Sequence, residues 1–251
     1  MGNLTMLNKV DPGENEEALR RGETPKYRPI NAGSLLLKQA LKDATKTAFG
    51  KRAKALVAPI QLGLGVKAGP ERLAWLAHSA FQLGKINDTD DVINAFNNLK
   101  RQAVLDAAFV QWPEATQLYN MYYGKPSIAL YVFHDADGRP HVRTILCREG
   151  TRMGCVLGSL GFDLAVDLFV YRPLTLLFGQ EVVTMRALTD DLHRVWEPPP
   201  TNSTADWEAT YDRIASFKAE YDKCAGPIGL ARHPTKAAIV LPAGAPLPSS
   251  L

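Results

Sequence analysis

Two hairpin patterns set among helical patterns constrain this chain most, because together they do not follow the regular strand, helix, strand order of a doubly wound parallel sheet. Residues 127–147 contain two strand-like runs separated by turn residues, and this pattern predicts a β-hairpin. A second hairpin is predicted over residues 182–196, with Asp190 and Asp191 at its tight turn. The sequence therefore predicts an α+β fold with antiparallel strands.

Apolar residues at helical spacing predict helices before, between and after these hairpins. The first helix is expected to run from the N-cap Ser34 to the stop residue Gly50. Further helices are expected over residues 70–81, 94–107, 113–124, 156–169 and 207–221, followed by a short strand over 237–241.

Composition divides the chain into three parts. Residues 1–25 are polar and are expected to form an irregular N-terminal segment. Residues 26–241 contain no linker and are expected to form one domain, whereas residues 242–251 are rich in Pro, Ala and Ser and are expected to be disordered. No apolar run approaches the roughly 20 residues that span a bilayer, and no signal peptide is recognisable. We therefore expect a soluble intracellular protein without a membrane partner.

Basic residues are concentrated near the N-terminus, although the net charge of the whole chain is only +3. Residues 26–54 contain eight Lys and Arg residues against the single acid Asp43. Lys38, Lys42 and Lys46 recur every four residues and would form a basic stripe along one helix. This stripe predicts contact with a nucleic acid, and an ordinary solvated face is the alternative interpretation.

Acidic residues stand at the ends of separate predicted strands, Asp91 in one group and Asp190 with Asp191 in the other. Magnesium prefers a few carboxylates together with substrate phosphate oxygens. Two ions roughly 4 Å apart activate an attacking hydroxyl and stabilise the leaving oxygen of an in-line displacement. Acids from separate elements near a basic segment therefore favour a nucleotide-polymerising site, and solvated turn acids are the alternative.

Six segments resemble, in order, motifs of the reverse transcriptases of non-LTR retroelements. Residues 26–30 (Lys-Tyr-Arg-Pro-Ile) are similar to the RPI segment of the fingers, and residues 61–65 (Gln-Leu-Gly-Leu-Gly) to the Q-x-G-x motif. Residues 91–97 (Asp-Val-Ile-Asn-Ala-Phe-Asn) resemble the first catalytic motif, and residues 150–159 the second, whose core is G-x-x-Q-G-x-x-x-[GS]. Residues 188–191 stand where the third motif has an aromatic residue, any residue and two aspartates.

The fourth motif is matched by residues 229–236, so that the resemblance extends from about Lys9 to about Leu241. It implies a right-hand polymerase with fingers and palm, in which helices back an antiparallel palm sheet. The implied activity is RNA-templated DNA synthesis, the transfer of a nucleotide from a dNTP to a primer 3′-OH. The implied cofactors are two Mg²⁺ ions, with Mn²⁺ as a substitute, and the implied partners are an RNA template, a DNA primer and dNTPs.

The resemblance also implies roles for single residues. Asp91, Asp190 and Asp191 would be the catalytic metal carboxylates, with the Val92 carbonyl as a further ligand. The spacing to the Asn-Ala-Phe of the first motif singles out Asp91 among the neighbouring acids, and Asp88 and Asp90 are then expected to be solvated.

Five residues would bind the nucleotide. Phe96 would be a steric gate against the ribose 2′-OH, with a plain core aromatic as the alternative. Met153 and Gly154 would lie over the incoming nucleotide, the glycine because backbone must approach it closely. Arg28 would contact the triphosphate or the template, and Lys236 would neutralise or protonate the departing pyrophosphate. A surface arginine and a solvated lysine are the alternatives for the last two.

Three departures from the family pattern qualify these expectations. Met153 replaces the usual Gln and Leu188 replaces the usual aromatic residue, changes that are expected to lower nucleotide affinity or alter fidelity. About ten residues follow the last motif, so the thumb is expected to be absent and the chain to be a fragment of a longer polyprotein or a relic. An inactive nucleic-acid-binding fragment and an RNA-templated RNA polymerase are the alternative functions.

Overall fold

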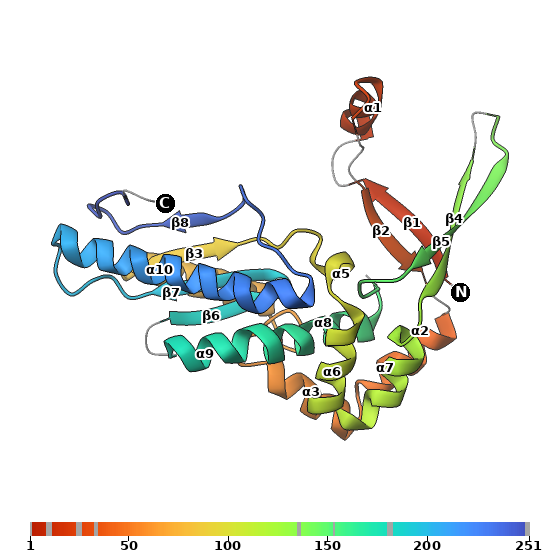
Figure 1. Cartoon of the computed structure of the whole chain (residues 1–251), viewed down its shortest axis with the longest axis horizontal. Coiled ribbons are helices and arrows are strands. Elements are labelled where there is room, and N and C mark those ends of the chain that lie inside the picture. The colour runs from red at the N-terminus through yellow and green to blue at the C-terminus, as the bar shows by residue number, and fades with distance from the viewer. Residues whose placement is uncertain are drawn as a thin grey trace.

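The computed structural model describes residues 2–8, 12–23, 27–32, 35–134, 137–152, 154–179 and 183–248. These residues form two four-stranded sheets with helices packed around them (Figure 1). The pairing is antiparallel except between β1 and β4, so the expected mixture of helices and antiparallel sheets is confirmed.

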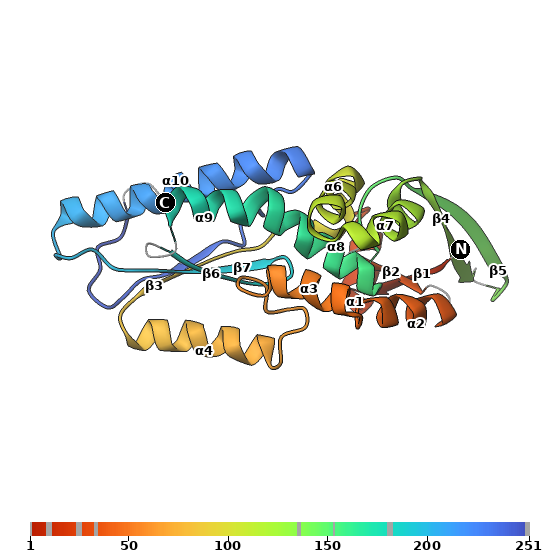
Figure 2. The ribbon, with the colours of Figure 1, turned by 90° about the horizontal axis from the view of Figure 1, so that it is seen from below.

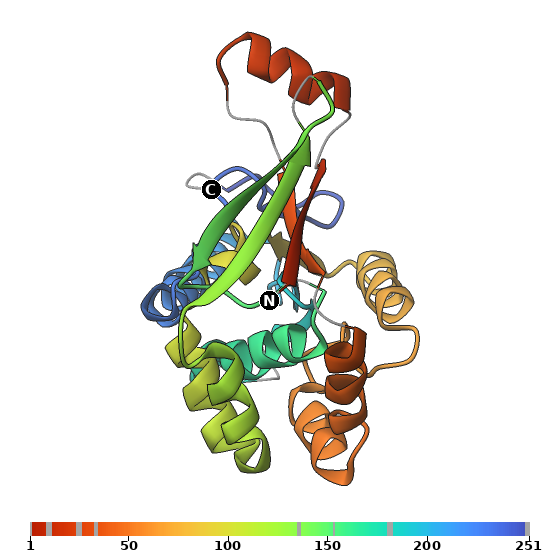
Figure 3. The ribbon, with the colours of Figure 1, turned by 90° about the vertical axis from the view of Figure 1, so that its right-hand side faces the viewer.

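The N-terminal sheet has the strand order β2-β1-β4-β5. Its strands are β1 (Gly2–Asn8), β2 (Tyr27–Ala32), β4 (Ser127–His134) and β5 (Pro140–Cys147), and α1 (Pro12–Arg20) lies between β1 and β2 in the chain. The β4–β5 hairpin extends outward on the side of the molecule where α1 lies (Figures 1 and 3). The segment 1–25, expected to be irregular, contains the strand β1 and the helix α1. The strand forms because β2 and β4 supply it with backbone partners that local sequence does not reveal.

The C-terminal sheet has the strand order β6-β7-β3-β8. Its strands are β3 (Ile86–Asp90), β6 (Val183–Leu188), β7 (Asp191–Trp196) and β8 (Ala238–Val240). Two helices, α9 (Arg172–Phe178) and α10 (Thr204–Ala225), cover one face of this sheet, and α4 (Gly69–Gln82) lies on the opposite face (Figure 2). Both hairpins predicted from turn residues, β4–β5 and β6–β7, are confirmed.

The core lies around α8 (Val156–Val166), which is buried along nearly its whole length. A Cβ on Gly161 would lie 2.7 Å from Val104 Cγ1, so the glycine allows α8 to approach α6 (Arg101–Gln111) closely. The chain then continues through the π-helical turn Asp167–Tyr171 into α9. The remaining helices are α2 (Leu35–Ala44), α3 (Ala48–Val57), α5 (Ala95–Asn98) and α7 (Thr116–Tyr123), with short 3₁₀ turns at Pro113–Ala115 and Gly226–Ile228.

The predicted helix 34–50 is divided into α2 and α3, and Gly50 is not its stop. Thr47 begins α3 as the N-cap, and its hydroxyl accepts a hydrogen bond from Gly50 N at 3.1 Å. A Cβ on Gly50 would lie 2.7 Å from the carbonyl oxygen of Ala44, so the glycine is needed where α3 folds back against the end of α2.

The predicted helix 94–107 is also divided, because two backbone groups near its middle bond to distant segments. Gly150 N donates to Leu99 O at 3.0 Å, and Lys100 N donates to Ile228 O at 2.8 Å. The predicted helix 156–169 is instead longer, since α8 continues through the π turn into α9. Of the expected tail, residues 242–248 are described, and Tyr211 Oη of α10 donates to Pro246 O at 2.5 Å.

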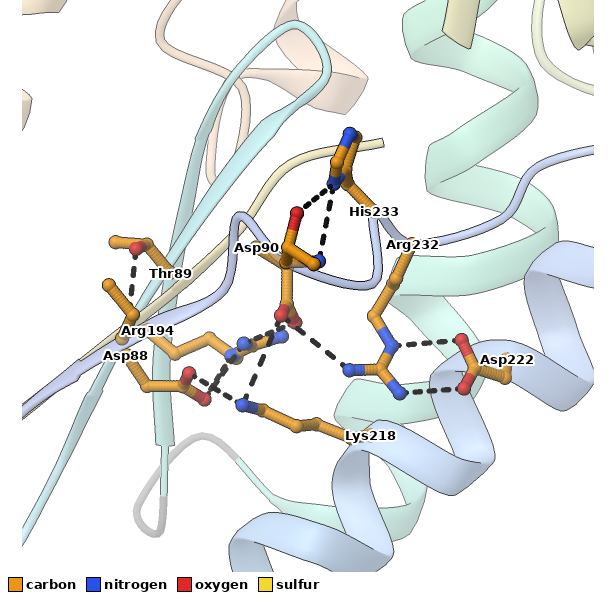
Figure 4. A network of polar contacts seen from close by, with 10 residues as sticks. Asp88, Thr89, Asp90, Arg194, Lys218, Asp222, Arg232 and His233 are labelled. Carbon is orange, nitrogen blue, oxygen red and sulfur yellow. Dashed lines mark hydrogen bonds and ion pairs between the residues drawn. The ribbon is translucent and has the colours of Figure 1, made fainter. Parts of the chain in front are cut away.

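A buried network of charged side chains joins the C-terminal sheet to α10 (Figure 4). Arg194 of β7 is fully buried and lies 2.8 Å from Asp88 Oδ2 and 2.5 Å from Asp90 Oδ2. Lys218 of α10 lies 3.1 Å from Asp88 Oδ1. The sequence analysis expected Asp88 and Asp90 to be solvated, and this expectation is wrong, because both side chains are buried and paired with bases. They point to one face of β3, where Asp88 is paired in register with Arg194.

The network continues to the loop after α10. Arg232 lies 3.6 Å from Asp90 Oδ1 and makes two hydrogen bonds to Asp222, of 2.8 and 2.7 Å. Three acids and three bases thus balance one another, which is the condition for holding charges away from water.

Replacement of Arg194 by Met would leave the buried Asp88 and Asp90 carboxylates with too little positive charge. We expect Arg194→Met to lower the free energy of unfolding by about 3–5 kcal/mol, measured by urea denaturation. The control Arg52→Gln breaks an exposed ion pair with Glu114 (3.3 Å) and should cost less than about 1 kcal/mol. Equal losses in the two variants would contradict this account.

Candidate functional site

The two groups of acids meet at one end of the C-terminal sheet. β3 and β7 pair antiparallel with Asp90 opposite Leu192, so Asp91 and Asp191 follow beside each other. Both line a cavity of about 240 Å³ together with Lys236. Asp190 is on the same turn and is half-buried. Its negative charge lies close enough to the buried Asp163 to raise the pKa of that carboxyl. The structure thus brings Asp91 and the Asp190-Asp191 turn together, as the sequence analysis expected of converging carboxylates.

Lys236 lies directly against the first of these acids. Its Nζ is 2.7 Å from Asp91 Oδ2, and both side chains are partly exposed. The adjoining backbone is tied to the loop before Lys236, because His233 N donates to Asp91 O at 2.7 Å and Ile93 N donates to Ala231 O at 2.9 Å. The segments that resemble the first and fourth motifs are therefore neighbours.

The Gln61 side chain makes two hydrogen bonds to the turn that carries the second group of acids, and we call this pair of bonds the clamp. Gln61 Nε2 donates to Thr189 O at 2.7 Å, and Thr189 N donates to Gln61 Oε1 at 2.9 Å. Thr189 has a φ of 60°, a left-handed conformation that a β-branched residue rarely adopts. Gln61 is fully buried, and a Cβ on Gly63 would lie 2.9 Å from Thr189 Oγ1. The sequence analysis assigned Gln61 only to a motif, although a glutamine within an apolar run was a signal of a specific buried partner.

Asp163 of α8 is a buried acid behind the same turn. Neither of its carboxylate oxygens has a hydrogen-bond partner among the described residues. Burial raises the pKa of the Asp163 carboxyl well above its usual value, and the nearby charges of Asp190 and Asp167 raise it further. The sequence analysis missed Asp163, whose signal was an acid inside an otherwise apolar helix.

The predicted nucleotide-binding residues are only partly described. Phe96 is half-buried, and its ring stacks on Phe162 with centroids 4.8 Å apart. Its carbonyl accepts a hydrogen bond of 2.7 Å from Thr151 N, which brings the segment before Gly154 against α5. Gly154 is exposed and has a φ of 82°, which favours glycine. Met153 and the side chain of Arg28 lie outside the described residues.

The predicted basic stripe lies on and just beyond α2, apart from the acids. Lys42 and Lys46 are exposed and Lys38 is half-exposed, and Lys46 lies 3.1 Å from Asp43. Helix α2 is beneath the N-terminal sheet, at the other end of the molecule from β8 (Figures 1 and 2).

Within the described ranges, no group of three or more His, Cys, Asp or Glu side chains is arranged to hold a metal ion. The donor set nevertheless fits a hard divalent cation, because carboxylates from two elements line one cavity and the Lys236 ammonium already lies against one of them. In the same part of the chain, no helix has the length and apolar character needed to cross a membrane.

No protein-family model and no curated protein matches the sequence. Solved structures do resemble the fold. Apo telomerase from Candida tropicalis, truncated from its C-terminal domain, aligns over 95% of this chain at a TM-score of 0.58 and 11% identity. Telomerase from Candida albicans in complex with the TWJ fragment of telomeric RNA aligns over 95% at 0.59 and 10% identity. The chain spans only 49% and 41% of those two chains. The fold of this chain is therefore similar to that of these telomerase structures.

Replacement of Gln61 by Leu tests the clamp. The backbone N–H and C=O of Thr189 would lose their partners, so we expect Gln61→Leu to destabilise the protein by about 1–3 kcal/mol. Hydrogen exchange of the Thr189 amide should also become faster. The control Gln82→Leu changes an exposed glutamine on α4 and should leave both quantities unchanged. Unchanged exchange at Thr189 in Gln61→Leu would exclude the clamp.

Replacement of Asp163 by Asn tests the raised pKa. An unfolded Asp ionises near pH 3.9, whereas the pKa of the folded Asp163 is raised above that value. Its contribution to stability is therefore present below about pH 4 and is lost as the pH rises through the folded pKa. We expect Asp163→Asn to be more stable than the wild type near pH 8, and the difference to shrink towards about pH 4 in urea denaturation. The exposed Asp212→Asn should show no such trend.

Proposed function

We propose that this chain is the fingers and palm portion of an intracellular reverse transcriptase of the non-LTR retroelement type. Its reaction would be RNA-templated transfer of a nucleotide from a dNTP to a primer 3′-OH. The N-terminal sheet would belong to the fingers and the C-terminal sheet to the palm. The observation that carries the proposal is the convergence of Asp91 with Asp190 and Asp191 on adjacent strands of a reverse-transcriptase-like fold.

Divalent cations would be held by the carboxylates of Asp91, Asp190 and Asp191 and by the Val92 carbonyl. Mg²⁺, or Mn²⁺ in its place, supplies activation of the attacking hydroxyl and stabilisation of the leaving oxygen when it is bound. Other side chains of the protein position these carboxylates. The buried ion pairs of Asp88 and Asp90 with Arg194 hold β3 and β7 in register. The two hydrogen bonds of Gln61 to Thr189 fix the conformation of the turn that carries Asp190 and Asp191.

Lys236 is proposed to act at the leaving group. In this structure its ammonium neutralises Asp91 at 2.7 Å, so a cation that takes over Asp91 would release the lysine. A released ammonium beside the cavity is suited to neutralise or protonate the pyrophosphate oxygen as the bond to the α-phosphate breaks.

The nucleotide would lie against Phe96 and the segment 150–154. Phe96 is held from behind by Phe162, so its ring is a rigid barrier suited to exclude a ribose 2′-OH. Gly154 would allow close approach of the nucleotide to the backbone, and Met153 and Arg28 are proposed as further contacts. Lys38, Lys42 and Lys46 would neutralise phosphates of the template or primer. The similar Candida albicans structure contains an RNA fragment, which supports nucleic-acid partners for the fold.

Incorporation of dTTP on poly(rA)/oligo(dT) in Mg²⁺ or Mn²⁺ tests this function. We expect metal-dependent incorporation, and a loss of about 10²–10³-fold or more in the Asp190→Ala, Asp191→Ala variant, because the carboxylates that would hold the charge-stabilising cations are removed. The control Asp212→Ala removes an exposed acid of α10 and should retain activity.

Equal incorporation by the wild type and the double variant would contradict the proposed site. RNA binding that falls steeply with salt, without any incorporation, would favour the alternative of an inactive nucleic-acid-binding fragment.

A further inference from the structure

The β4–β5 hairpin has two faces of different chemistry. Its register pairs Tyr131 with Arg143 and Phe133 with His141, so these four side chains share one face. The opposite face is aliphatic and solvent-exposed, with exposed fractions of 41% at Ile128, 45% at Val132, 61% at Val142 and 50% at Leu146. A hairpin that only covered the core would bury one of these faces along its length, and neither is buried along the outer part.

The rings on the first face are stacked into a continuous row. The centroids of Tyr131 and Phe133 are 5.5 Å apart with planes 20° from parallel, and those of Phe133 and His141 are 5.3 Å apart at 21°. Arg143 places its guanidinium carbon 5.4 Å from the centre of the Phe133 ring. His141 and Arg143 are exposed and the other two rings are partly exposed. Near-parallel rings with an adjacent cation form a surface on which further flat rings are able to stack.

The strands of the hairpin favour an anionic occupant, whereas the turn that joins them contains both acids and a base, Asp135, Asp137 and Arg139. Neither β4 nor β5 contains an acidic residue, and Arg143 is the charged side chain of the ring face. The hairpin projects away from α6 and α7, on the same side as α1 (Figures 1 and 3), where a long flexible strand has access to it. A purely structural role is the alternative, because stacking among cross-strand rings stabilises a hairpin. Such a role does not require that the rings be exposed or that their face lack acids.

We propose that Tyr131, Phe133, His141 and Arg143 form a binding platform for single-stranded nucleic acid, with bases stacked on the rings and a phosphate held by Arg143. The role of this platform, to hold the unpaired part of the template, rests on the proposed function. Its binding is measurable without metal or dNTPs. Proteins that hold single strands use this combination of aromatic stacking and cationic contact, which tolerates any base because every base has a flat face.

Fluorescence anisotropy with a labelled oligo(rA) of about 15 nucleotides, in the absence of divalent ions and dNTPs, tests the platform. We expect Phe133→Leu to weaken binding by about 5- to 150-fold, the range for one base–aromatic stack, because Phe133 holds Tyr131 and His141 in the row whose outer faces would take the bases. Arg143→Gln should reduce the slope of log affinity against log salt by about 0.7, the value for one phosphate contact on a single strand. A duplex of equal length should compete at least about tenfold less well, because its bases are not free to stack.

The matched control changes the other face of the same hairpin. Val132→Ala, Val142→Ala would share any loss of hairpin stability, which thermal melting measures in all variants, and should bind RNA like the wild type. Wild-type affinity in Phe133→Leu, an equal loss in the valine variant, or equal competition by duplex would each overturn the platform.

Two further comparisons separate the platform from the polymerase activity. The Asp190→Ala, Asp191→Ala variant should bind the oligonucleotide like the wild type. Ring-dependent binding by a chain that fails to incorporate dTTP supports the platform and contradicts the proposed function. Incorporation by a chain whose binding does not depend on Phe133 overturns the platform alone.

Discussion

The ion pairs of Arg194 with Asp88 and Asp90 are the interaction on which the candidate site depends. Asp88 and Asp90 belong to the strand that delivers Asp91, and Arg194 belongs to the strand that begins at Asp191. A slip of one residue between these strands would turn the acids to the opposite face and leave all three charges buried without partners. The same charges bind α10 through Lys218, so the helix that backs the sheet is fixed relative to the acids.

The turn between β6 and β7 is held by hydrogen bonds rather than by ion pairs. Its strained residue, Thr189, is fixed through backbone hydrogen bonds to Gln61, a residue 128 positions earlier in the chain. The acid Asp163 lies behind the turn and has no hydrogen-bond partner in the described part of the chain, which is costly in the interior. Strain and an unsatisfied polar group at one place are typical of functional sites, where surrounding structure compensates for them.

The sequence was informative where structure is decided locally. The two hairpins follow from their turn residues, whereas the approach of Asp91 to the Asp190-Asp191 turn is a long-range contact that was expected from the order of the motifs. Tertiary contacts decided the rest. The breaks at Thr47 and at Lys100 reflect a close helix crossing and a bond to Ile228 O, and neither is visible in helical periodicity. The burial of Asp88 and Asp90, and the roles of Gln61 and Asp163, likewise depend on partners far away in the chain.

The balance of charge in the buried network also limits how this sequence is able to diverge. Its members come from four separate stretches of the chain, the residues 88–90, 194, 218–222 and 232. Loss of Arg194, Asp88 or Asp90 leaves an opposite charge without a partner in the interior, whereas exchange of the buried set for apolar residues of similar volume is tolerated. These positions are therefore expected to covary as a unit among descendants of this chain, although surface loops between them drift independently.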